Sequence, residues 1–154
     1  MDEQLLETWT IHNRINAYLL DNIAPEALSG TAASKGRSVA EVFAHMHNNR
    51  LAWLVPAAPD LLSGLVKLEK QTPADVAVLR RSLEDSGEAI QSLLRRSLSL
   101  DGKIKGFKPH AVAFLGYLFS HESYHRGEIG IILAQTGHPL DKKVSYGMWE
   151  WGVR

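Results

Sequence analysis

The sequence has no cysteine among its 154 residues. A disulfide framework is therefore excluded, and any tight transition-metal site must use histidine and carboxylate ligands. The absence of disulfides makes the cytoplasm the default location. The first residues, M-D-E-Q-L-L-E, are acidic, so the basic start and apolar run of a signal peptide are missing as well.

Excess positive charge and long apolar runs are also absent. Lysine plus arginine and aspartate plus glutamate each total 17, which gives a formal net charge of zero. A duplex nucleic-acid binder needs a concentrated basic face, so we expect no nucleic-acid partner. Charged residues interrupt every long apolar stretch before it reaches the ~20 residues of a membrane span, so we expect no membrane association.

The apolar residues that are present recur at helical spacing in four long segments, with little strand signal. The length fits one domain, so we expect residues 1–154 to form a single all-α four-helix bundle. Its simplest arrangement is antiparallel, although the long link between the second and third helices would permit a crossover. The tail, residues 141–154, should pack on the bundle because Tyr146, Trp149 and Trp151 carry large apolar area.

The ends of these helices follow from capping patterns. The expected helices cover roughly residues 3–22, 38–56, 72–98 and 108–135. Ser38 and Glu41 have the S-x-x-E spacing of a capping box at the start of the second helix. Thr72 and Pro73 suit the N-cap and first position of the third helix, and Pro109 suits the first turn of the fourth.

A histidine pair is the most informative feature of the chain. The segment S-H-E-S-Y-H-R-G-E places His121 and His125 one helical turn apart, with Cβ atoms within roughly 6 Å. Two imidazoles at that distance can hold one divalent cation. Tyr117 and Glu128 fall on the same arc, whereas Arg126 points away and is expected to form a structural ion pair. An isolated H-x-x-x-H is more often a pair of exposed histidines without a metal.

A second histidine cluster makes a metal site more plausible than a pair of exposed histidines. The segment V-A-E-V-F-A-H-M-H-N-N-R-L-A-W places His45 and Asn49 on one helix face and His47 on roughly the opposite face. His45 could complete a three-His site between facing helices, with coordination positions left for water or substrate. The alternative for His45 is a hydrogen-bonded core histidine, and His47 is expected to face solvent. His12 could line the same cavity, but its spacing carries no signature.

Two longer patterns together resemble a known family. They are S-V-A-E-V-F-A-H with a tryptophan eight residues later, and H-E-S-Y-H-R-G-E before L-A-Q-T-G-H-P-L. This combination resembles the DinB-like (YfiT-like) superfamily of metal-binding four-helix bundles over nearly the whole chain. The resemblance implies a homodimer and a divalent metal, typically nickel or zinc, held by His45, His121 and His125.

The resemblance also implies a class of chemistry. Characterised relatives include S-transferases and isomerases that use the metal-bound thiolate of a low-molecular-weight thiol cofactor, such as bacillithiol or mycothiol. This sequence departs from the family pattern at Glu128, where the family usually has glutamine, and in the extra His47. Glu128 could be a fourth ligand, a hydrogen-bond partner of a ligand, a general base or a member of a salt bridge.

These observations give one expected function and two alternatives. The expected function is a metal-dependent, thiol-dependent transferase or a hydrolase that acts on a small-molecule substrate. The first alternative is a non-catalytic metal-binding helical dimer that acts as a binding or stress-related module, since no Ser-His-Asp order, phosphate loop or nucleotide fingerprint is visible. The second is a plain bundle without a metal.

Overall fold

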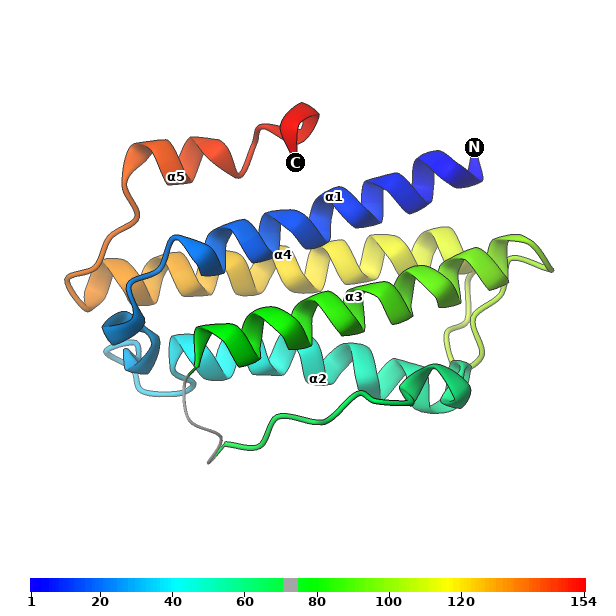
Figure 1. Cartoon of the computed structure of the whole chain (residues 1–154), viewed down its shortest axis with the longest axis horizontal. Coiled ribbons are helices and arrows are strands. Elements are labelled where there is room, and N and C mark those ends of the chain that lie inside the picture. Colours follow the sequence, from blue (N-terminus) through cyan, green and yellow to red (C-terminus); the bar gives the residue numbers. More distant parts are fainter. Residues whose placement is uncertain (71–74) are drawn as a thin grey trace.

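The predicted four-helix bundle is confirmed by the computed structural model, which describes residues 1–70 and 75–154 (Figure 1). The long helices are α1 (Asp2–Asp21), α2 (Val39–Ala57), α3 (Val76–Leu98) and α4 (Ala111–Gln135). Shorter pieces are the helix α5 (Lys142–Gly147) and the 3-10 turns η1 (Pro25–Ser29), η2 (Pro59–Leu62) and η3 (Trp151–Val153). Within the described residues, no helix is long and apolar enough to cross a bilayer.

The connection between α2 and α3 is a crossover, so the simpler antiparallel expectation is wrong. In Figure 1 the chain leaves α2, passes η2 and returns along the bundle before α3 begins, so α2 and α3 run in the same direction. The 19 residues of α2 are about 28 Å long, a distance that roughly nine extended residues can span. Asn48 fixes the returning segment, because its side chain donates to the Leu68 carbonyl (2.8 Å) and accepts from the Leu68 amide (2.9 Å).

Side-chain caps set the starts of three of the four long helices. The capping box is confirmed at α2, where Ser38 Oγ accepts from the Glu41 amide at 3.2 Å and Glu41 Oε2 accepts from the Ser38 amide at 2.7 Å. The predicted cap at Thr72 and Pro73 lies outside the described residues, and Asp75 is the N-cap of the described helix. α4 begins three residues later than expected because His110 Nδ1 accepts from the Ala113 amide (3.1 Å) and leaves Pro109 outside the helix.

The apolar core lies in two parts with a polar layer between them. One part packs residues such as Leu19 and Phe43, and the other packs residues such as Leu54 and Phe114. In the layer between, the buried Glu122 of α4 accepts from Arg50 Nε (2.7 Å) and Nη2 (2.8 Å). One carboxylate thus joins the middle of α2 to the middle of α4.

The same carboxylate also holds α1. Asn16 Nδ2 donates to Glu122 Oε2 at 2.6 Å, and His12 Nε2 lies 2.9 Å from that oxygen. Burial alone would raise the pKa of Glu122, but the Arg50 charge and the hydrogen bonds from Arg50 and His12 outweigh it and hold that pKa below its ordinary value. Glu122 is therefore a buried carboxylate that stays ionised.

This layer also contains His12, a candidate for the cavity lining, and Arg126, for which the expected ion pair is wrong. His12 does not line the predicted cavity but is buried against Glu122, with its ring next to Phe119 (centroids 4.6 Å apart). Arg126 donates to Asn16 Oδ1 at 2.6 Å, and among the described residues no carboxylate lies within 4.0 Å of its guanidinium. Arg126 therefore completes a hydrogen-bond network instead of an ion pair.

The buried histidines predict how stability depends on pH. Burial lowers the pKa of His12 despite the opposing effect of Glu122, and burial likewise lowers the pKa of His47. Each group thus takes up a proton more readily in the unfolded chain, whose histidines titrate near pH 6.5. We expect the free energy of unfolding of the metal-free protein to be highest above about pH 6.5 and to fall as the pH decreases below it.

Urea unfolding followed by tryptophan fluorescence at about pH 7.5 and 5.5 measures this difference. A His138→Gln variant, altered at an exposed loop histidine, should keep the full pH dependence. Unfolding free energies that stay equal or rise on acidification would contradict the prediction.

The C-terminal segment contacts α1 through small and charged residues. Val144 is buried, Gly147 lies so close to the Tyr18 side chain that an added Cβ would clash with it, and the Arg154 guanidinium lies 3.8 Å from the centre of the Tyr18 ring. The expected packing of the tail aromatics is wrong for Tyr146 and Trp149, which are 71% and 78% exposed. The segment is attached around Tyr18 instead.

Candidate metal centre

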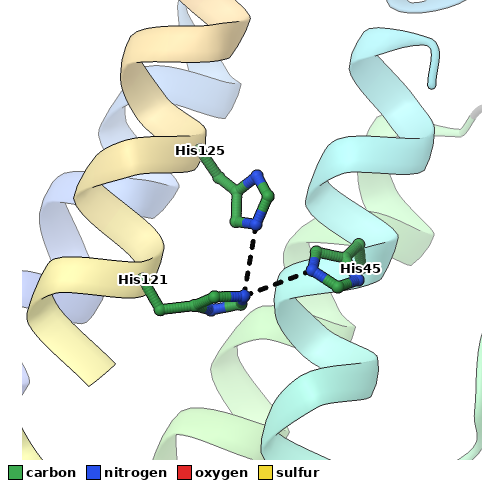
Figure 2. A group of neighbouring side chains, drawn as sticks. All are labelled: His45, His121 and His125. Carbon is green, nitrogen blue, oxygen red and sulfur yellow. Dashed lines mark hydrogen bonds between the residues drawn. The ribbon is translucent and has the colours of Figure 1, made fainter. Parts of the chain in front are cut away.

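Three predicted histidines meet between α2 and α4 (Figure 2). α2 supplies His45, and α4 supplies His121 and His125. The Nε2 atom of His121 lies 3.2 Å from His45 Nε2 and 3.2 Å from His125 Nε2. A ligand atom from each of the three residues lies within 4.8 Å of the others. Helices that run in opposite directions thus bring together residues 76 positions apart.

These distances fit a divalent metal. Metal–nitrogen bonds of about 2.0–2.1 Å in a tetrahedral site place neighbouring ligand nitrogens about 3.3–3.4 Å apart. The two measured separations of 3.2 Å are close to that value. The three residues could therefore hold a metal ion with only small movements of the rings.

The protonation state of the rings also fits metal binding. Burial, with smaller effects of the Arg37 charge and the other two histidines, lowers the pKa of His45 to about 4. Burial and the charge of His125 lower the pKa of His121 as well. His45 and His121 are therefore neutral at pH 7, which is the form of histidine that binds metals.

Comparison with known proteins identifies the family. The model of the DinB family matches residues 1–142, which is nearly the whole chain. The chain belongs to the DinB family. Searches of curated proteins and of solved structures found no match. The resemblance seen in the sequence is thereby confirmed, and the three-His cluster of this DinB-family chain is compatible with metal binding.

Aromatic and amide groups surround the rings in the DinB-family bundle. Tyr117 stacks on His121, with centroids 5.9 Å apart and planes 14° apart. Asn49 Nδ2 lies 3.4 Å from His121 Nδ1. The edge of Tyr124 lies against His125, with centroids 5.2 Å apart. These contacts restrict the orientation of the two α4 histidines before any ion binds.

Glu128 contacts the outer nitrogen of His125. Its Oε2 lies 2.8 Å from His125 Nδ1, while His125 Nε2 points toward His121. A carboxylate only accepts hydrogen bonds, so Nδ1 carries the proton and Nε2 presents its lone pair. Glu128 is thus a hydrogen-bond partner of a candidate ligand in this DinB-family site.

Removing that hydrogen bond should weaken metal binding. We expect Glu128→Leu to lower the zinc affinity by about 10–100-fold, because His125 loses the acceptor that fixes its tautomer and orientation. Glu128→Gln keeps a hydrogen-bond acceptor and should lose less zinc affinity than Glu128→Leu. Competition with a chromophoric chelator measures both affinities, with Glu7→Gln, at an exposed residue of α1, as the control. A Glu128→Leu protein with wild-type affinity would show that this contact does not support the site.

His47 does not face solvent, so that expectation is wrong. It is 1% exposed, and its ring nitrogens each lie 2.9 Å from a carbonyl oxygen, one of Ser82 and one of Val66. The first carbonyl belongs to α3 and the second to the segment that returns from η2. The crossover covers the side of α2 on which His47 lies, which leaves His45 as the histidine of α2 that meets α4 in this DinB-family bundle.

Proposed function

We propose that this DinB-family protein is a metal-dependent enzyme that holds one nickel or zinc ion through His45, His121 and His125. The observation that supports the proposal is the convergence of their nitrogens between two helices, with His45 and His121 partly exposed. Three protein ligands, compared with the four of a closed structural zinc site, leave room for a further ligand. We propose a transferase that uses a low-molecular-weight thiol, or a hydrolase that uses water.

The metal would supply Lewis acidity, which lowers the pKa of a coordinated water or thiol and yields a nucleophile near neutral pH. Because the chain has no cysteine, the thiol must come from a small cofactor. In the transferase reaction the thiolate sulfur forms a bond to an electrophilic carbon of the substrate, and the leaving group departs with its bonding electrons. In the hydrolase reaction the oxygen of water would form the bond to the electrophilic carbon, the leaving group would depart with its bonding electrons, and the proton of the water would be released.

The protein side chains have separate tasks in this proposal. The Glu128 carboxylate accepts from His125 Nδ1 through Oε2, and its other oxygen can take up the proton that the nucleophile releases. Tyr117 and Tyr124 restrict water around the α4 histidines because their rings lie against His121 and His125.

Elemental analysis and turnover assays test the function. Protein purified without chelators should contain about one equivalent of nickel or zinc per chain. The metal-loaded protein should transfer small thiols to alkylating electrophiles, or hydrolyse small esters, faster than the chelator-treated protein. A protein that takes up neither metal would refute the metal site. A loaded protein with no exchangeable ligand and no activity would instead favour a non-catalytic binding module.

Two further parts of the proposal concern the setting of the protein. We propose that it works as a homodimer in the cytoplasm. Size-exclusion chromatography with light scattering measures the mass of the protein, which is compared with the 17.1 kDa of one chain. Fractionation of cells measures its location.

A further inference from the structure

An open cleft of about 320 Å³ lies beside His45 on α2. Its walls are the start of α2 and the segment that returns toward α3. His45 belongs to both the cleft and the three-His cluster. A molecule in the cleft would therefore be next to the candidate metal position.

Basic residues outnumber acidic ones around this cleft. The charged residues that line it are Arg37, Glu41, Lys67, Glu69 and Lys70. Glu41 accepts from the Ser38 amide in the capping box, and Lys67 lies 3.3 Å from Glu69 in an exposed pair. In the described part of the chain, no carboxylate lies within 4.0 Å of the Arg37 or Lys70 nitrogens. These two cations remain available to a ligand.

Arg37 and Lys70 line the same cleft as His45, one of the candidate metal ligands. Their charges give this side of the cluster a positive potential. A bound divalent ion would add to this positive potential, and such a potential attracts anions.

We propose that this cleft binds the anionic group of the small molecule whose reacting atom reaches the metal, with Arg37 as its main contact and Lys70 as a second. The group is a carboxylate, phosphate or sulfonate, since a guanidinium recognises each through charge-assisted hydrogen bonds. The proposal rests on the metal-dependent function above and adds the charge of the substrate or thiol cofactor.

Cobalt-loaded protein allows a direct test with two simple thiols. Thiolate binding to Co²⁺ produces a charge-transfer absorption band, which reports the affinity of mercaptoacetate and of its neutral analogue mercaptoacetamide. We expect Arg37→Gln to weaken the binding of mercaptoacetate by about tenfold and the binding of mercaptoacetamide by less than about twofold. Only mercaptoacetate carries the anionic group that loses a charged hydrogen bond. Arg37→Lys keeps the charge and should retain part of the preference, and Lys70→Gln should show a smaller loss than Arg37→Gln.

Lys105→Gln is the matched control. It removes one positive charge beside Gly106, which lies near Pro56 at the opposite end of α2, and it should change neither affinity. Equal effects of Arg37→Gln on both thiols, or no effect on either, would overturn the inference while Co²⁺ binding still supports the metal site. Failure of the wild-type protein to bind Co²⁺ would overturn the proposed function and this inference together.

Discussion

Replacing His121 with alanine is expected to lower zinc or nickel affinity more than about 100-fold, which exceeds the usual effect of losing a residue that only contacts a ligand. His121 has the central position in the cluster, since its Nε2 lies 3.2 Å from the Nε2 atoms of both other histidines. Without it, the two remaining imidazoles hold the ion with one ligand fewer. The fold should persist because the His121 side chain is partly exposed and lies outside the apolar core.

Chelator competition measures the affinity, and circular dichroism with urea unfolding measures the fold. His45→Ala should behave in the same way as His121→Ala. His125→Ala should lose a similar part of the metal affinity but should also lower the stability, because the His125 side chain is buried. His47→Ala is the informative control, because it removes a histidine two positions from His45 whose ring faces α3. It should keep the metal affinity and lose stability. If His47→Ala lost the metal and His45→Ala retained it, the assignment of the α2 ligand would be wrong.

The sequence predicts local features of this protein well. Apolar periodicity identifies all four long helices, and the S-x-x-E pattern locates the start of α2 because both partners of the capping box lie within one turn. The pair His121 and His125 could be found for the same reason, since a helix fixes the relation of residues four apart. His45 needed the additional assumption that α2 and α4 face each other.

Features that depend on distant contacts could not be predicted in this way. The direction of α3 depends on the segment held by Asn48 and His47, and this contact also buries His47. Glu122 was missed although it is adjacent to His121, because a carboxylate in a helix usually faces solvent. Its partners Arg50 and His12 are 72 and 110 residues away in the chain. The signal that could have revealed them is a set of polar and charged residues on the otherwise apolar faces of α1, α2 and α4.

That buried ion pair leads to the second large expected effect. Removing one partner leaves the other charge buried and unpaired, which typically costs about 3–5 kcal/mol. We therefore expect Arg50→Met and Glu122→Gln each to lower the free energy of unfolding by about that amount, and the melting temperature by about 10 °C or more for a chain of this length. Arg50 also donates to the Leu83 carbonyl at 2.8 Å, so its loss weakens the contact between α2 and α3 as well.

A double variant separates the cost of an unpaired charge from the net value of the pair. Arg50→Met combined with Glu122→Gln removes both charges, so the destabilisation of this double variant should be smaller than the sum of the single effects. Arg96→Met, which breaks the exposed pair with Asp60, should change stability much less. Thermal and urea unfolding measure the stability of the two single variants, the double variant and Arg96→Met. If the single variants were no less stable than Arg96→Met, Glu122 would not be ionised in the folded state. If the effects on the free energy of unfolding were strictly additive, Arg50 and Glu122 would act independently. Glu122 immediately follows His121, within the turn that joins His121 to His125. The single variants should therefore also weaken metal binding through misplacement of α4, and the double variant should recover part of that affinity together with its stability.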